Sequence, residues 1–314
     1  MNGGKRMIKQ KFAVLCAIIF LLTGCGEEQK EPFLPQEEIL YGEWQGEDYY
    51  ILSQSTESGI CQIDCYDKNL LPKTTVQAES WGELADHIPQ GWMIWDLYEN
   101  TWFSKQGKIE KSENMGARVS RTPNGEILAY TLPDKTGFAV LRKGQEKQYQ
   151  MEFVTDLVCI DDSTVWINRF DKANQNTSVF VNLETGEIIS EKKGAYTVER
   201  CGNTAVLRPS IVLGTGEESA WLFDPQTQEW TKLDFINSSE SSSIRFSCNG
   251  NYAVVANTEQ AQIICYETKN GSEITSFPME EGYDLYQNSK VHTVSYNGKA
   301  VLIEESGIIR RMER

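Results

Sequence analysis

The sequence predicts an all-β chain, on two observations. Short runs rich in Val, Ile, Tyr, Phe and Trp alternate with clusters of Gly, Asn, Asp and Ser, which is typical of strands joined by turns. A similar turn also returns about every forty residues. Its markers, spaced by 38, 37, 42, 42 and 43 residues, are Asn69, Gly107, Gly144, Gly186, Gln228 and Gly271. A repeat of this length holds about four strands, so it predicts the blades of a β-propeller.

Residues 1–24 have the layout of a secretory signal peptide. Lys5, Arg6, Lys9 and Lys11 precede an apolar run of 11 residues, Phe12 to Leu22. A helix that crosses a bilayer needs roughly 20 apolar residues, so this run favours a signal peptide over a transmembrane anchor.

The tetrapeptide LTGC at 22–25 resembles the bacterial lipobox. The resemblance implies cleavage between Gly24 and Cys25 and a diacylglycerol on the Cys25 sulfur, which would make Cys25 the first residue of the mature lipoprotein. The alternative is an ordinary signal peptide that happens to end near a cysteine. No second apolar run of spanning length follows, so we expect the remaining chain to be soluble and lipid-anchored at the extracytoplasmic face of the cell membrane.

Residues 25–38 are predicted to be the lipidated cysteine and a flexible acidic spacer, because GEEQKEPFLPQEE is rich in Glu, Gln and Pro. Loss of residues 1–24 would change the formal net charge from −15 to −19. Nucleic-acid binding draws most of its affinity from contacts between cations and phosphates, so this acidity disfavours it.

Residues 39–314 are predicted to form the propeller domain. Strands alternate with turns throughout, and only ESWGELADHI at 79–88 could form more than a couple of helical turns. Asn-Gly recurs at 124–125, 249–250 and 297–298, where it supplies a positive φ at little cost. The apolar strand after each such turn, as in YAVVA, suits a strand packed on both faces.

Two of these segments, SRTPNGEILAY and FSCNGNYAVV, carry a resemblance to the WD40-like and TolB-like β-propeller repeats, as does the turn NLETGEII. The resemblance spans roughly residues 39–314 and implies four-stranded antiparallel blades. Cys248 stands where the repeat has proline, and the Gly-His and Trp-Asp pairs of true WD40 blades are missing.

We expect seven blades. Six turn markers imply six units, and the C-terminal stretch supplies three more strands. The segment EEILYGEWQ at 37–45 is predicted to close the last blade as its fourth strand. Eight blades would follow if 76–101 hides a short blade, and six if the first two units merge.

Cysteine usage leaves the redox state open. Apart from Cys16 and Cys25, six cysteines remain: Cys61, Cys65, Cys159, Cys201, Cys248 and Cys265. Cys61 and Cys65 lie four apart on one expected strand, about 13 Å, which is too far for a disulfide. Cys201 and Cys248 occupy equivalent positions in successive units and could meet, or serve as small buried hydrophobic residues.

Catalytic and metal-binding motifs give little support for an enzyme. No Gly-x-Ser-x-Gly, His-Glu-x-x-His or phosphate-binding loop occurs, and no Cys-x-x-Cys accompanies the two histidines. We therefore predict no catalytic residue, no metal and no cofactor. His87 and His292 are expected to be structural or exposed, and the acidic pairs at 161–162 and 304–305 to be solvated.

The candidate binding residues are four tryptophans within 22 positions, Trp81, Trp92, Trp95 and Trp102. Exposed tryptophan suits a sugar face or a protein anchor, while core packing is the competing interpretation.

Three functions fit this sequence. The first is a membrane-anchored module that binds an envelope protein or a glycan. The second is a glycosidase-like or lactonase-like hydrolase that uses carboxylates of the central funnel, and the third is a passive subunit of an envelope complex. A propeller fold hosts all three; we favour the binding module.

Overall fold

The computed structural model divides the chain into two compact units, Met1–Pro32 and Phe33–Arg314. It describes residues 38–45, 48–54, 61–78, 84–88, 91–95, 100–104, 109–112, 118–170, 175–209, 219–235, 244–247, 249–257, 259–279, 289–305 and 308–314. The predicted signal peptide, Cys25 and most of the predicted spacer lie outside these residues. In the described ranges, no helix is long and apolar enough to span a membrane.

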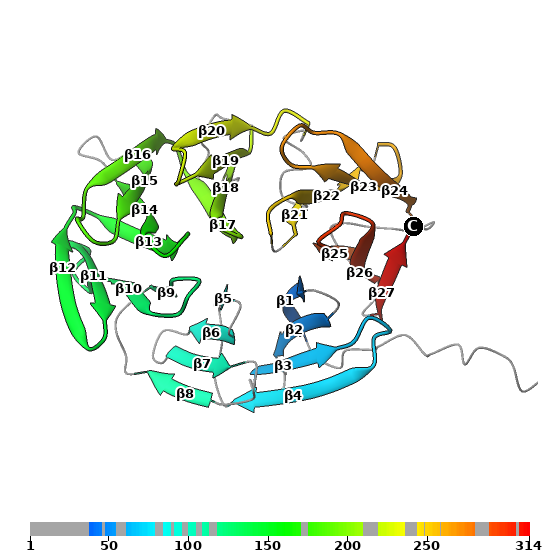
Figure 1. Cartoon of the computed structure of the whole chain (residues 1–314), viewed down its shortest axis with the longest axis horizontal. Coiled ribbons are helices and arrows are strands. Elements are labelled where there is room, and N and C mark those ends of the chain that lie inside the picture. The colour runs from blue at the N-terminus through cyan, green and yellow to red at the C-terminus, as the bar shows by residue number, and fades with distance from the viewer. Residues whose placement is uncertain are drawn as a thin grey trace, which may run out of the picture. The chain divides into compact units, whose positions relative to one another are not determined.

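The described residues of the second unit form seven antiparallel sheets, which confirms the all-β prediction (Figure 1). The first sheet contains β1 (Glu38–Gln45), β2 (Asp48–Gln54), β3 (Cys61–Tyr66) and β4 (Pro72–Ala78). The second contains β5 (Leu84–Ile88), β6 (Gly91–Trp95), β7 (Asn100–Ser104) and β8 (Ile109–Ser112). The third contains β9 (Val119–Arg121), β10 (Ile127–Thr131), β11 (Gly137–Arg142) and β12 (Gln145–Gln150).

The remaining sheets follow the same order. The fourth contains β13 (Val154–Cys159), β14 (Thr164–Phe170), β15 (Asn176–Asn182) and β16 (Ile188–Lys193). The fifth contains β17 (Tyr196–Cys201), β18 (Thr204–Pro209), β19 (Trp221–Asp224) and β20 (Glu229–Lys232). The sixth contains β21 (Arg245–Phe246), β22 (Tyr252–Asn257), β23 (Gln262–Glu267) and β24 (Glu273–Pro278). The seventh contains β25 (Ser289–Val294), β26 (Ala300–Glu305) and β27 (Ile308–Glu313).

The described part of 79–88 is a strand: Leu84–Ile88 form β5 and pair with β6, in keeping with the all-β prediction. One prediction about the N-terminal half was wrong. The predicted closing strand is β1, but β1 pairs with β2 in the first sheet, and the seventh sheet has three described strands. Strands that follow one another in sequence usually pair, and β1 follows this rule by pairing with β2.

The middle strands are buried on both faces, as the sequence predicted. Along β22, Val254 and Ala256 pack toward the seventh sheet, whereas Ala253 and Val255 pack toward the fifth. Successive strand residues point to opposite faces, so one apolar strand joins two neighbouring sheets. The outer strand β12, by contrast, is largely exposed and polar.

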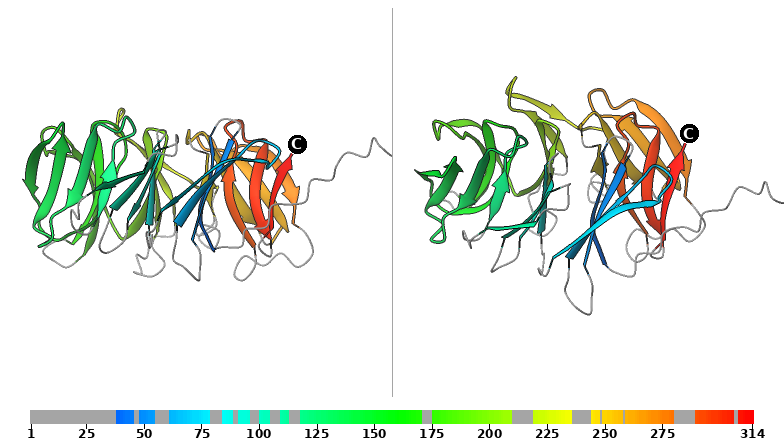
Figure 2. Two further views of the ribbon diagram at one scale, coloured as in Figure 1. Left: turned by 90° about the horizontal axis from the view of Figure 1, so that it is seen from below. Right: turned by 60° about the horizontal axis from the view of Figure 1, so that its bottom comes forward.

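The same alternation is seen in the fourth and seventh sheets. On β15, Val179 and Val181 pack against the third sheet while Phe180 packs against the fifth. On β26, Ala300 and Leu302 contact Tyr49 and Ile51 of the first sheet. The first strands are also neighbours, since β1, β5, β9, β13 and β17 approach one another in chain order and β25 approaches both β21 and β1. The sheets of this unit therefore follow one another in sequence order (Figures 1 and 2), and the described apolar clusters pack the third to seventh sheets and the first face to face.

The three Asn-Gly turns share one hydrogen-bond pattern. Gly125, Gly250 and Gly298 have φ of 75°, 72° and 71°. A hydroxyl two residues before each asparagine donates to its Oδ1, from Thr122, Ser247 and Ser295. The same hydroxyl oxygens accept the N–H groups that begin the next strands, at 3.1, 3.0 and 3.0 Å. The repeated unit is thus Ser/Thr-x-Asn-Gly. Its hydroxyl fixes the conformation of the turn, because it bonds both the asparagine side chain and the backbone of the next strand.

Candidate functional site

The tryptophans predicted to bind a ligand are only partly placed by the structure. Trp81 lies outside the described residues, Trp92 and Trp95 are in β6, and Trp102 is in β7. The backbone register sets Trp92 opposite Phe103 and Trp102 opposite Met93. Their side chains lie outside the described part, so a tryptophan site here stays a prediction.

His292 is a structural histidine. It is buried on β25, and its Nε2 lies 2.9 Å from Oε2 of Glu304 on β26. The exposed fractions of the two side chains are 7% and 17%. Glu304 is therefore not the solvated residue that the sequence suggested. His87 lies on β5, and its side chain is outside the described residues.

The acidic pair at 161–162 serves the turn after β13. Asp161 is buried, and its Oδ1 accepts hydrogen bonds from the Ser163 amide at 2.8 Å and the Ser163 hydroxyl at 3.0 Å. Oδ1 of Asp162 accepts the Asn124 amide at 2.9 Å, from the turn of the third sheet. The prediction of solvated carboxylates was wrong for Asp161. Among the described side chains, no group of three or more His, Cys, Asp or Glu residues could hold a metal ion.

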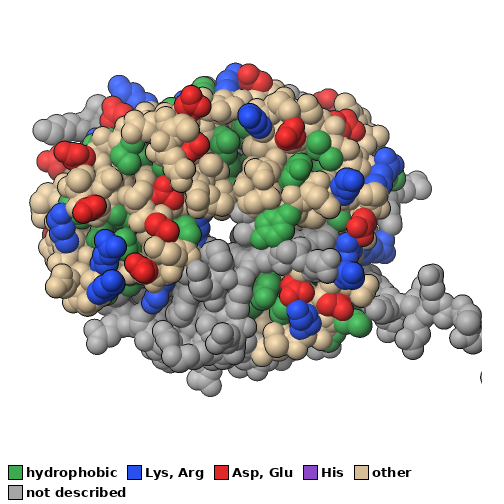
Figure 3. Space-filling view, viewed as in Figure 1, with side chains coloured by type: hydrophobic (Ala, Val, Ile, Leu, Met, Phe, Trp, Pro, Cys, Tyr) green, Lys and Arg blue, Asp and Glu red, His purple; other side chains and the backbone are tan. Residues whose placement is uncertain are grey.

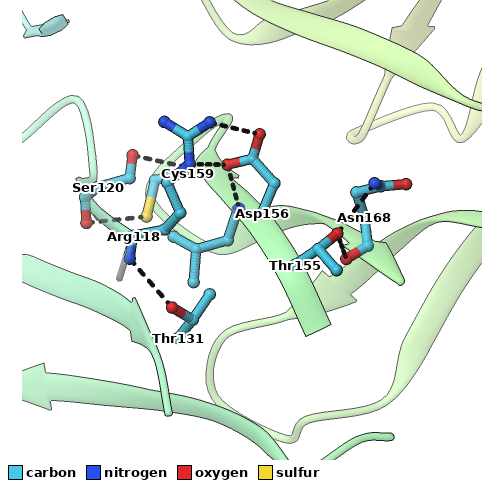
Figure 4. Close-up of polar contacts among 8 residues, drawn as sticks. Arg118, Ser120, Thr131, Thr155, Asp156, Cys159 and Asn168 are labelled. Carbon is cyan, nitrogen blue, oxygen red and sulfur yellow. Dashed lines mark hydrogen bonds and ion pairs between the residues drawn. The ribbon is translucent and has the colours of Figure 1, made fainter. Parts of the chain in front are cut away.

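The densest polar network joins the first strands of the third and fourth sheets (Figure 4). Arg118, just before β9, forms a two-pronged ion pair with Asp156 on β13: Nε to Oδ1 is 2.9 Å and Nη2 to Oδ2 is 3.2 Å. Oδ1 of Asp156 also accepts the Leu157 amide at 2.8 Å. Burial raises the pKa of Asp156, and the Arg118 charge opposes that shift. The planar fork of arginine fixes the geometry of this pair.

Three further hydrogen bonds belong to this network, and two of them, from Arg200, reach the fifth sheet. The Ser120 hydroxyl accepts the Cys159 amide at 2.9 Å. Arg200, on β17, donates from Nη1 to the carbonyl oxygens of Arg121 and Cys159, at 2.8 and 2.9 Å. One guanidinium thus connects the first strands of three successive sheets. We call Arg118, Ser120, Asp156, Cys159 and Arg200 the inner polar network.

Beside it, Asn168 of β14 donates from Nδ2 to the Thr155 hydroxyl at 3.0 Å (Figure 4). On the fifth sheet, Arg208 forms an ion pair with Glu199 at 3.2 Å, and both side chains are about one-fifth exposed, at 20% and 18%. These contacts lie within or between neighbouring sheets, so they hold the scaffold in register.

Four cysteines with described side chains are buried thiols. Cys61 and Cys65 share β3, as predicted, and cannot bridge each other. Cys65, Cys159, Cys201 and Cys265 are buried and not in disulfides. Burial raises the pKa of Cys265 to about 12. Cys248 lies outside the described residues, but the backbones around Cys201 and Gly250 do approach each other.

A second aromatic group escaped the sequence analysis. Trp221 and Trp230 of the fifth sheet lie with ring centroids 6.3 Å apart, and Trp230 also contacts Phe180 and Phe223. The ammonium of Lys192, on β16, lies 3.7 Å from the Trp221 centroid. The two tryptophans are nine residues apart on separate strands, so only hairpin pairing brings them together. On the face in Figure 3, Lys and Arg lie interspersed with Asp and Glu among the described residues.

No protein-family model matches the chain, and no curated protein matches it. Solved structures do resemble it. Kuenenia stuttgartiensis hydrazine synthase matches with a TM-score of 0.55 at 10% identity, over 92% of this chain and 99% of that one. The Neurospora crassa Pan2 WD40 domain matches with a TM-score of 0.53 at 15% identity, over 88% of each chain.

The β-propeller domain of Myceliophteria thermophila Cps50 (Swd1) matches with a TM-score of 0.57 at 12% identity, over 91% of this chain and 99% of that one. At such identities the likeness concerns the fold alone. The described part of the second unit is all-β, with six four-stranded antiparallel sheets and one sheet of three described strands, and it is similar in fold to WD40 β-propeller domains.

Proposed function

We propose that this chain is a membrane-anchored extracytoplasmic lipoprotein whose residues 39–314 form a seven-bladed β-propeller, and that the propeller binds an envelope protein or a glycan. The observation that carries the proposal is the face-to-face packing of successive sheets, together with the likeness to propeller domains. Such packing yields a rigid scaffold whose loops and edges are available for contact.

Two contacts support closure between the first and seventh blades. Tyr49, Ile51 and Tyr66 of the first sheet form one apolar cluster with residues of β26 and β27. Arg311 on β27 also donates to the backbone carbonyl of Lys68. In this arrangement the ring closes by packing of whole sheets, and among the described strands none is shared between the ends of the chain.

The partners of the carboxylates favour binding over hydrolysis. A glycosidase needs two carboxyl groups about 5 to 9 Å apart that are available to substrate and water. Asp156 is held by Arg118, Glu199 by Arg208, and Glu304 by His292. Each of these groups stabilises its own or a neighbouring sheet, so it is a poor candidate for an acid or a nucleophile.

The anchor is tested by fractionating cells that express the full chain with Cys25→Ala. We expect the variant to leave the membrane fraction after a salt wash, because the lipid attaches to this sulfur. Cys16→Ala is the matched control: it changes a cysteine in the apolar run and should stay in the membrane fraction. If Cys25→Ala stays membrane-bound after the wash, the anchoring proposal fails.

Binding is tested by crosslinking on intact cells, followed by identification of the captured partner and by measurement of its affinity for the purified protein. A saturable partner or glycan supports the module. Turnover of glycans or lactones that disappears when Asp156 or Glu199 is changed to the amide would replace this proposal with the hydrolase.

A further inference from the structure

The outer strand of the fourth sheet places a lysine among three aromatic rings of the fifth. The Lys192 ammonium lies 3.7 Å from the Trp221 centroid, 5.6 Å from that of Trp230 and 5.9 Å from that of Tyr196. Each distance is within the range of a cation–π interaction. We call these four residues the Lys192 cage.

The rings of the cage are fixed by their surroundings. Trp221 and Trp230 meet edge to face at 81°. The Trp230 indole donates from Nε1 to the Ser190 hydroxyl at 3.0 Å, and Ser190 shares a face of β16 with Lys192 because the two are two residues apart. Tyr196 is buried at the start of β17. The cage would therefore keep its shape if the lysine side chain left it.

Two features suit the cage to a ligand from outside. Trp221, Trp230 and Lys192 are each partly exposed, so the site borders solvent. The Trp221 Nε1 is buried, and among the described atoms it has no hydrogen-bond partner. A buried N–H donor without an acceptor costs free energy. A hydrogen-bond acceptor on a ligand, such as a hydroxyl oxygen, would remove that cost.

We propose that the Lys192 cage is a binding site for small organic cations of the quaternary-ammonium class, with the Lys192 ammonium acting as a built-in competitor. Aromatic faces attract such cations because the ring quadrupole is negative at its face, and a methylated ammonium loses little hydration on entry. The strongly acidic chain, with a formal net charge of −15, favours the approach of cations. The site goes beyond the proposed function and does not depend on the membrane anchor.

Choline and its neutral isostere 3,3-dimethyl-1-butanol test the proposal by isothermal titration calorimetry on the purified protein. In Lys192→Ala we expect choline to bind about 10-fold more tightly than the isostere and more tightly than it binds the unsubstituted protein. Lys192→Met is the matched control: it fills the cage without a charge and should bind neither. The double variant Lys192→Ala with Trp221→Ala should lose the preference for choline.

A second measurement uses the unsubstituted protein and does not require any variant to fold. Choline should displace Lys192 and increase its acylation by an amine-reactive reagent, read by mass spectrometry, whereas the isostere should not. The proposal is overturned if choline leaves the reactivity of Lys192 unchanged, or if a folded Lys192→Ala shows no preference for choline.

Discussion

Arg200 allows a sharp test of how the sheets are held together. Replacing it with methionine keeps most of the aliphatic stem and removes the guanidinium that donates to the carbonyl oxygens of Arg121 and Cys159, at 2.8 and 2.9 Å. A hydrogen bond from a charged donor contributes about 1.5–3 kcal/mol. The two bonds share one group and are not fully additive, so we expect Arg200→Met to lower the free energy of unfolding by about 2–4 kcal/mol.

Arg142→Met is the matched control for this variant. Arg142 is 56% exposed, and its nearest carboxylate oxygen, on Glu126, is 3.9 Å away. An exposed pair of this kind contributes about 0–1 kcal/mol. Urea unfolding followed by tryptophan fluorescence measures both variants, provided that the slope of the transition is unchanged. Equal losses in the two would refute the claim that Arg200 joins three sheets.

Three further predictions concern single positions. Gly250→Ala should destabilise the folded protein more than Gly144→Ala in the same unfolding assay. The two glycines have similar φ angles, +72° at Gly250 and +77° at Gly144. A Cβ at Gly250, however, would lie 2.8 Å from the Cys201 carbonyl oxygen, whereas a Cβ at Gly144 would meet nothing within 4 Å. Tyr130→Phe should raise the pKa of Glu146 toward its ordinary value, because the hydrogen bond from the Tyr130 hydroxyl lowers that pKa; an NMR titration measures it. This hydrogen bond stabilises the fold fully at pH values above the ordinary carboxyl pKa. The stabilisation is lost as the pH falls through the lowered pKa of Glu146 in the folded protein. Cys265, with its pKa raised to about 12, should resist alkylation by iodoacetamide at pH 8 until the protein unfolds, and rapid labelling of the folded protein would contradict its burial.

Much of the fold was predictable from local pattern. Apolar runs, Asn-Gly turns and the forty-residue spacing are properties of neighbouring residues, and they correctly predicted four-stranded sheets with buried middle strands. The pairing partner of the N-terminal strand could not be predicted in this way. Whether Glu38–Gln45 joins the first or the last sheet depends on contacts between the ends of the chain, and no local pattern encodes that choice.

Residues 84–88 show that local composition is a weak guide. Leu84 and Ala85 favour a helix, but the segment pairs with β6, because tertiary pairing outweighs a propensity difference of a few tenths of a kcal/mol per residue. His292 shows another limit. The pairing of β25 with β26 shifts register between Val291 and Thr293, so strict alternation along the strand could not predict where the His292 side chain lies.

The placement of polar groups bears on where ligands can bind. Turns after the first strands interlock, since Asn124 contacts Asp162 of the next sheet, and Asn249 donates to the Tyr296 carbonyl at 3.4 Å. The inner polar network also joins neighbouring sheets, through residues on or next to the first strands. Groups committed to the scaffold cannot change partner for a ligand without loosening the contacts between sheets.

The Lys192 cage differs in this respect. It is built largely from the outer strands β16 and β20 together with β19, and its cation is a flexible side chain that can leave without breaking a strand pairing. Opening it removes the cation–π contacts, roughly 0.5–2 kcal/mol for each good contact, which an incoming cation restores. An incoming cation would take the place of the Lys192 ammonium against the same rings, so among the described polar groups this outer site is better suited to reversible binding than the inner network.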